Sequence, residues 1–267
     1  MLVRDLSSID LSLSPGNTGT DGTYLKCRTV ENGIPCYYKF SLFDEYRGFY
    51  GYESFNEVIA YRLGRILGLN VLKQSLVTAK VRVKGVEYTT VGCMSRSYKR
   101  KSENRMTIGE FYIRYRLSGE SPLATLTRLG YSWFTDILFL FDYLIISRDR
   151  HDSNVEVLTD GTNWRFAPLY DNGVSLLAPI NLGLEKDVFR DHVNRFNPLT
   201  DVVVNNFIGS KSLQKNLENI KNPVRVNRLT KEDKSRLFYE MNSYLPRFYK
   251  DKIWEIICLR YSYLRKV

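Results

Sequence analysis

The stretch of sequence that decides the fold is "IISRDRHDSNVEVL", residues 145–158. Charged and polar residues crowd its centre, and apolar, strand-like residues flank it on both sides. Polar side chains in such a place must be exposed at a turn or gathered around something charged. Within this stretch Asp149 precedes Asn154 by five positions, and a second segment, "APLYDNG" (167–173), follows after another strand-like run.

This order and spacing of residues is the one that phosphoryl transfer from ATP uses. One aspartate accepts the proton of the attacking hydroxyl, while an asparagine and a second aspartate hold Mg²⁺ against the nucleotide phosphates. Mg²⁺ is a hard cation that prefers oxygen ligands, and ligands on two segments place the metal between the two loops. The pattern predicts Asp149 as the proton acceptor, Asn154 and Asp171 as metal ligands, and Arg148 or Arg150 as offsets for carboxylate repulsion.

The two segments together resemble motifs of the HipA-like serine/threonine kinases. That family has an Asp-Arg-His-x-x-Asn loop followed by an Ala-Pro-x-Tyr-Asp segment, and "DRHDSN" and "APLYD" match both in order. The chain departs from the pattern at Ser147, where the family often has Asn, and at "DNG", where ordinary protein kinases have Asp-Phe-Gly. Either segment alone would be read as a turn. The resemblance implies phosphorylation of Ser or Thr in a protein, with ATP and Mg²⁺ as cofactors.

A kinase also needs a loop over the phosphates, and "SPGNTGTDG" supplies Gly16, Gly19 and Gly22 between two strands. Glycine lets the backbone approach a phosphate closely. The spacing departs from Gly-x-Gly-x-x-Gly, and an ordinary loop has the same composition. Ser14 is the first residue of this segment and Ser12 lies close by, and the family resemblance implies that phosphorylation of a serine here silences the kinase.

The resemblance also assigns a cation and its partner. Lys39, in the strand-like "CYYKF", corresponds to the lysine on the nucleotide phosphates, and Glu57, on the helix that follows, to the glutamate that pairs with it. Lys26, one strand earlier, and Glu53, one helical turn earlier, are alternatives. Met94, at the end of a strand-like segment, completes the residues assigned to the nucleotide.

The rest of the chain predicts an α+β, two-lobed, protein-kinase-like fold. Residues 11–42 indicate an antiparallel sheet with an Asn-Gly turn, residues 52–70 a helix of about four turns, and residues 74–94 two strands around a Lys-Gly turn. After the basic stretch 95–105, helical patterns dominate. We therefore expect a β-rich N-lobe over residues 1–97 and a helical C-lobe over residues 98–267.

Several other classes of protein are disfavoured. The longest apolar stretch, residues 131–146, is interrupted by Asp136 and Asp142 and is shorter than the roughly 20 residues of a membrane span, so it predicts a buried helix. The N-terminus has no secretory signal pattern, which indicates the cytoplasm. Four cysteines without paired spacing and only two histidines argue against a structural metal or a disulfide framework.

The formal net charge of +10 and pI near 9.3 favour polyanionic partners: a nucleotide, a nucleic acid or an acidic protein surface. Residues 97–105 of the basic stretch are interpreted as a solvated connector between lobes rather than a nucleic-acid patch. His151 is interpreted as a residue that holds its loop by a hydrogen bond. Expected partners are a protein with a Ser or Thr acceptor and, from the family resemblance, an antitoxin. The alternatives are a lipid or small-molecule kinase of the same fold, a basic nucleic-acid-binding protein and a pseudokinase.

Overall fold

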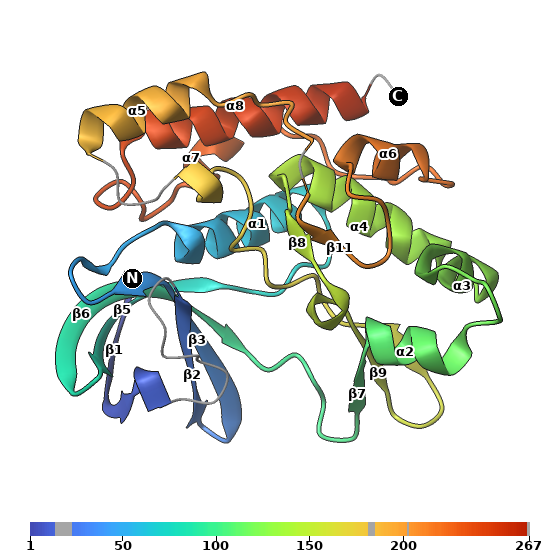
Figure 1. Ribbon diagram of the computed structural model, residues 1–267, viewed down its shortest axis with the longest axis horizontal. Helices are drawn as coiled ribbons and strands as arrows, with labels where there is room; N and C mark the ends of the chain where they lie inside the picture. The colour runs from blue at the N-terminus through green and yellow to red at the C-terminus, as the bar shows by residue number, and fades with distance from the viewer. Residues whose placement is uncertain (14–22, 181–184, 202, 266–267) are drawn as a thin grey trace.

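The computed structural model describes residues 1–13, 23–180, 185–201 and 203–265. Its N-terminal part is a curled sheet with the order β1-β5-β6-β3-β2, and β4 pairs with β3 (Figure 1). The fold is α+β and two-lobed, as predicted. The strands of this sheet are β1 (Leu2–Asp10), β2 (Thr23–Glu31), β3 (Ile34–Asp44), β4 (Gly48–Phe49), β5 (Ser75–Val83) and β6 (Val86–Arg96).

Two tight turns of this sheet occur where the sequence predicts them. Asn32 and Gly33 join β2 to β3 with φ of +51° and +75°, and Lys84 and Gly85 join β5 to β6 with φ of +47° and +80°. Positive φ at both central residues is what a two-residue hairpin turn requires, and Asn and Gly adopt it most readily. The two hairpin predictions are therefore confirmed.

The prediction for the first strand is wrong. The sequence indicates a strand from residue 11 in an antiparallel sheet, but residues 11–13 form a 3₁₀ helix and the strand is β1, which ends at Asp10. β1 pairs in parallel with β5, with Leu2 opposite Val77. A parallel pair needs a long crossover connection, so no local turn signal announces it.

Helix α1 (Glu53–Leu67) crosses between the sheet and the helices of the C-lobe (Figure 1). It has the predicted length of about four turns and ends at Gly68, whose φ of +79° is the left-handed conformation common at helix ends. A Cβ at Gly64 would lie 2.2 Å from Cγ2 of Val71, so only glycine permits this approach. Val71 in turn forms a β-bridge with Leu169, just before Asp171. The segment that contains Asp171 is thereby attached to the chain that leaves α1.

The C-lobe is mainly helical. Most residues of α4 (Ser132–Ile145) are buried, as predicted for the apolar stretch 131–146, and this helix contributes to one apolar core together with α1 and α8 (Arg247–Leu264). None of the helices in the described part of the chain has the length and apolar content that a bilayer-spanning helix requires. The helices are α2 (Ile108–Tyr115), α3 (Pro122–Arg128), α4 (Ser132–Ile145), α5 (Lys186–Arg195), α6 (Leu213–Glu218), α7 (Asp233–Leu237) and α8 (Arg247–Leu264), with 3₁₀ turns η1 (Leu11–Leu13), η2 (Asp152–Asn154) and η3 (Ala178–Ile180).

The C-lobe also contains short strands. β7, β9 and β10 form a three-stranded sheet, and β8 pairs in parallel with β11 (Figure 1). These strands are β7 (Asn104–Thr107), β8 (Asp149–Arg150), β9 (Glu156–Thr159), β10 (Trp164–Phe166) and β11 (Asn205–Asn206). The last strand of the N-terminal sheet ends at Arg96, and the division of the lobes at residue 97 stays a prediction.

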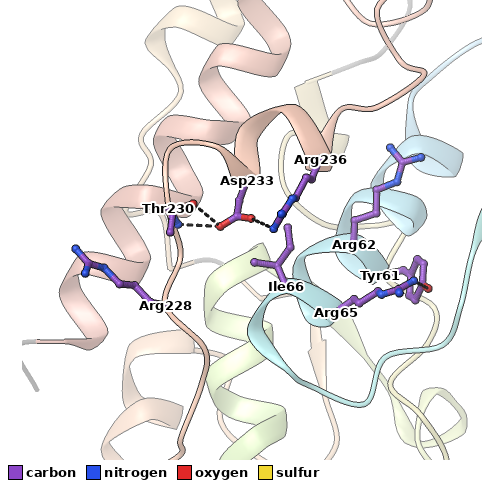
Figure 2. Close-up of a pocket in the computed structure, with 8 residues that line it drawn as sticks. All are labelled: Tyr61, Arg62, Arg65, Ile66, Arg228, Thr230, Asp233 and Arg236. Atoms are coloured by element: carbon purple, nitrogen blue, oxygen red, sulfur yellow. Dashed lines mark hydrogen bonds and ion pairs between the residues drawn. The ribbon is translucent and has the colours of Figure 1, made fainter.

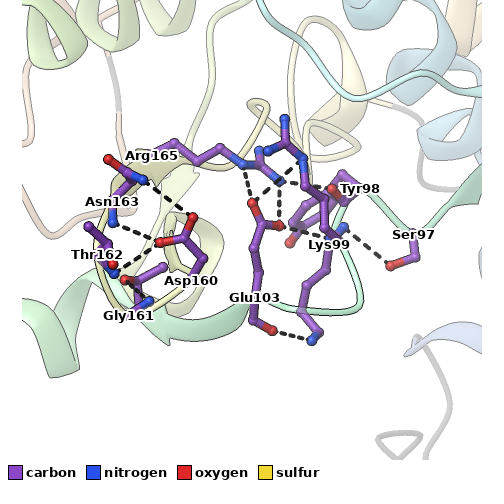
Figure 3. A network of polar contacts seen from close by, with 11 residues as sticks. Ser97, Tyr98, Lys99, Glu103, Asp160, Gly161, Thr162, Asn163 and Arg165 are labelled. Carbon is purple, nitrogen blue, oxygen red and sulfur yellow. Dashed lines mark hydrogen bonds and ion pairs between the residues drawn. The ribbon is translucent and has the colours of Figure 1, made fainter.

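The connector after β6 is attached to the C-lobe through Glu103, which is only 4% exposed. Both carboxylate oxygens of Glu103 accept hydrogen bonds of 2.7 Å from Arg165 on β10, and Arg100 N donates to the same carboxylate at 2.8 Å. Figure 3 shows Arg165 reaching across from its strand to Glu103 and to the backbone of Tyr98. The prediction of a solvated connector is therefore wrong at Glu103, because one acidic side chain of this basic stretch is buried in an ion pair.

This ion pair predicts a pH-dependent contribution to stability. The hydrogen bonds from Arg165 lower the pKa of Glu103 from 4.5 to about 2, so its contribution is complete above about pH 4.5 and is lost as the pH falls towards 2. We expect Glu103→Gln to lower the free energy of unfolding by about 2 kcal/mol at pH 7, less than for a fully buried pair because Arg165 is partly exposed.

The measurement is urea unfolding of wild type and Glu103→Gln at several pH values. The difference between the two should shrink below pH 4.5, while Glu45→Gln, in an exposed pair with Lys84, should change little at any pH. A Glu103→Gln effect that stays constant down to pH 3 would contradict the assignment.

Candidate active site

Three segments far apart in the sequence meet at the side chain of Lys39. Lys39 lies on β3, and its Nζ is 2.9 Å from Oε1 of Glu57 on α1 and 2.6 Å from Oδ1 of Asp171. Burial alone would lower the pKa of Lys39, but the two carboxylates outweigh it and raise that pKa. For the carboxyl group of Asp171 the effects have the opposite sign: burial alone would raise its pKa, but the positive charge of Lys39 lowers it by more. Asp171 is therefore held ionised. We call Lys39, Glu57 and Asp171 the lysine cluster.

Lys26 and Glu53, the alternatives to Lys39 and Glu57, do not take part in the lysine cluster. Lys26 lies directly opposite Lys39 on the neighbouring strand and is exposed. Glu53 is 4% exposed, and its carboxylate has no hydrogen-bond partner among the described residues. Burial raises the pKa of Glu53 to about 7. The glutamate that pairs with Lys39 is thus Glu57.

The loop with the predicted proton acceptor begins in β8. Asn154 Nδ2 donates to the backbone oxygen of Asp149 at 3.0 Å, which closes the loop between them. Oδ1 of Asp149 accepts a hydrogen bond of 2.9 Å from Nδ2 of Asn205, on the paired strand β11. The sequence motifs end at Gly173, so spacing gave no signal for Asn205.

Arg150 holds the two motif loops together from inside the protein. It is 1% exposed and pairs with the equally buried Asp142, with Nη2 and Nε at 2.6 and 3.1 Å from the carboxylate oxygens. It also donates to the backbone oxygen of Tyr170 at 2.8 Å and to Oδ1 of Asn172 at 3.0 Å, one residue on each side of Asp171, and to Oγ of Ser147 at 3.4 Å. Tyr170 Oη donates to Ser153 O at 2.6 Å, next to Asn154. The predicted metal ligands are therefore fixed on loops that are bonded to each other.

The two arginines beside Asp149 have different roles. The charge of Arg150 is among the causes that lower the pKa of Asp171, so it does offset a carboxylate of the site. Arg148 instead donates to Leu176 O at 2.9 Å, and burial lowers its pKa to about 10. His151 Nδ1 accepts a hydrogen bond of 3.3 Å from Ser153 N at the start of η2, which is the structural role expected for it.

The structure explains why the segment after Tyr170 reads "DNG" where ordinary protein kinases have Asp-Phe-Gly. Asn172, in the position of the phenylalanine of ordinary protein kinases, is 2% exposed, and its side chain accepts the hydrogen bond from Arg150. Its backbone N donates to Oε2 of Glu57 at 3.1 Å, so the glutamate that binds Lys39 also holds this loop. Asp171 itself has a φ of +58°, a conformation that Asp and Asn tolerate better than most residues.

Other predicted site residues are not brought to the lysine cluster. Met94 lies opposite Tyr38 on the neighbouring strand, whereas Lys39 lies opposite Cys93. Because side chains alternate along a strand, the side chain of Met94 is on the other face of the sheet from Lys39. Its role in nucleotide binding stays a prediction. Gly16, Gly19, Gly22 and Ser14 lie outside the described residues.

The donor chemistry of the site fits Mg²⁺. Asn154 and Asp171 offer an amide and a carboxylate oxygen, the hard ligands that Mg²⁺ prefers. No group of three or more His, Cys, Asp and Glu side chains suited to a metal occurs in the described ranges.

Comparison with known proteins adds support for the fold. No family model and no curated protein matches the sequence. The Helicobacter pylori proinflammatory kinase CtkA superposes with a TM-score of 0.59 at 17% identity, over 95% of this chain and 94% of that chain. HipA of Shewanella oneidensis MR-1, solved with HipB and operator DNA, has a TM-score of 0.45 at 15% identity, over 92% of this chain and 66% of that one. The chain thus shares its two-lobed fold with a known kinase.

Proposed function

We propose that this protein is an ATP- and Mg²⁺-dependent kinase that phosphorylates Ser or Thr in a protein substrate. The observation that carries the proposal is the lysine cluster, in which Lys39 lies within 2.9 Å of Glu57 and 2.6 Å of Asp171, from segments 18 and 132 residues away. A kinase requires this lysine–glutamate pair and a metal-binding aspartate next to it. The loop with Asp149 and Asn154 is bonded to the same segment.

Each residue has a defined task in the transfer. Lys39 neutralises phosphate charge, and Glu57 keeps its ammonium group in place. Asn154 and Asp171 would hold Mg²⁺, which neutralises charge on the phosphates and orients them. Asp149 takes the proton of the acceptor hydroxyl while the hydroxyl oxygen bonds to the γ-phosphorus and the bond to the ADP oxygen breaks. Asn205 orients the carboxylate of Asp149 through its 2.9 Å hydrogen bond.

The test is transfer of labelled phosphate from ATP to protein, lipid and small-molecule acceptors. Label in Ser or Thr of a protein supports the proposal. Label only in a lipid or small molecule would show a kinase of the other substrate class, and no Mg²⁺-dependent ATP binding would show that the chain is not a kinase. An antitoxin partner stays a prediction from the family resemblance.

Asp171→Asn should weaken binding of Mg²⁺-ATP itself by at least about tenfold, because the variant loses the anionic ligand of the metal. The measurement is calorimetric titration of Mg²⁺-ATP into the wild type and the variant. Asp187→Asn, which changes an exposed aspartate on α5 by the same charge, should bind as the wild type does. Equal affinity of the Asp171→Asn and wild-type proteins would exclude Asp171 as a metal ligand.

A further inference from the structure

A pocket of about 580 Å³ lies beside the second half of α1, and none of its lining residues belongs to the lysine cluster. Its residues come from two segments, the second half of α1 and the chain around the start of α7, as Figure 2 shows. The volume falls within the range of small-molecule sites, about 300–1,000 Å³. The lining residues are Tyr61, Arg62, Arg65, Ile66, Arg228, Thr230, Asp233 and Arg236.

The charge of this pocket is unbalanced, with four arginines against one aspartate. Asp233 is already occupied: its carboxylate accepts hydrogen bonds from Thr230 N and Oγ1 and pairs with Arg236 Nη1 at 3.0 Å. Arg62, Arg65 and Arg228 have no carboxylate within ion-pair distance in the described part of the chain. Three arginines that line this pocket are therefore not engaged in an ion pair with any described residue, although the charge of Glu240 acts on Arg62.

The arginines differ in how firmly they are held. Arg62 Nη1 donates to Leu237 O at 3.0 Å and to Tyr239 O at 2.6 Å, so it joins α1 to the end of α7. Burial lowers the pKa of Arg62, because a partly buried cation is less well solvated than an exposed one. Arg65 contacts Tyr61 Oη at only 3.4 Å and is exposed, and Arg228 is exposed as well. Their guanidinium groups remain available to a ligand.

We propose that this pocket binds a small ligand with two or more phosphate groups. Guanidinium groups form paired, charge-assisted hydrogen bonds with phosphate oxygens, and arginine is the residue best suited to this recognition. One or two arginines are enough to bind a single phosphate group. Because arginines line the pocket from both segments, we expect a ligand that carries more than one phosphate group. Tyr61 and Ile66 supply the less polar part of the lining.

The test uses inorganic pyrophosphate as the probe, titrated calorimetrically into the full chain. Arg65→Gln/Arg228→Gln should weaken pyrophosphate binding by at least about tenfold, because two charge-assisted contacts are lost. Both side chains are exposed, so the fold should be retained, and a thermal unfolding curve checks this. If the double variant does not fold, Arg228→Gln alone gives the same readout with a smaller loss.

Two controls separate this pocket from other sites. Arg114→Gln/Arg195→Gln removes two exposed arginines elsewhere and should leave the affinity unchanged. Lys39→Ala removes any pyrophosphate that binds at the lysine cluster but should leave binding at this pocket unchanged, so a titration of Lys39→Ala measures the pocket alone whether or not the protein is a kinase. Loss of pyrophosphate binding in Lys39→Ala but not in Arg65→Gln/Arg228→Gln would overturn the proposal. So would no binding by the wild type, or pocket-dependent binding of an RNA oligonucleotide without binding of pyrophosphate.

Discussion

Asp149→Asn should lower the rate of phosphoryl transfer by about 10²- to 10⁴-fold, the usual contribution of a positioned general base. The amide cannot take the proton of the acceptor hydroxyl, but its oxygen can still accept the hydrogen bond from Asn205. The loop geometry should therefore persist, and the affinity for Mg²⁺-ATP should change little. An effect on kcat without an effect on ground-state binding is the signature of an interaction made in the transition state.

The matched control for this variant is Asp152→Asn, three residues later in the same loop and half exposed. It should retain nearly the full rate, because no task is assigned to Asp152. Steady-state kinetics with a labelled protein acceptor, together with calorimetric titration of Mg²⁺-ATP, measures both quantities. Normal turnover in Asp149→Asn, with a collapse in Asp152→Asn, would reassign the base.

Arg150→Met should destabilise the protein by about 3–5 kcal/mol, because it leaves the carboxylate of Asp142 buried without its partner. Both members of this pair are almost fully buried, at 1% and 2% side-chain exposure. The variant also loses the hydrogen bonds to Tyr170 and Asn172, so Mg²⁺-ATP binding should weaken along with stability.

A double variant separates the two effects of Arg150. Arg150→Met/Asp142→Asn removes the unpaired charge and should recover part of the stability, but not the nucleotide binding, because the bonds to the loops are still missing. Arg195→Met, in an exposed pair with Asp191, should cost less than about 1 kcal/mol. Urea unfolding supplies the comparison. Equal destabilisation by Arg150→Met and Arg195→Met would show that the buried pair does not organise the site.

The sequence by itself determined the features that depend on neighbouring residues. The hairpin turns at Asn32-Gly33 and Lys84-Gly85 and the length of α1 follow from local backbone preferences and from helical periodicity. The order of the motifs predicted to be catalytic and metal-binding is likewise visible in one short region, residues 149–173. The two-lobed fold could therefore be predicted before any contact between the lobes was known.

Only the tertiary structure decided which distant residues meet. It paired Lys39 with Glu57, where the sequence also allowed Lys26 and Glu53, and it brought Asn205 to Asp149 from a segment without a motif. These choices depend on which face of a strand or helix is turned towards a neighbour, and packing between distant segments sets that orientation. The parallel pairing of β1 and the burial of Glu103 could not be predicted from the sequence for the same reason. β1 pairs with β5 and Glu103 binds Arg165 on β10, and both strands lie more than 60 residues away, so no local sequence pattern indicates either contact.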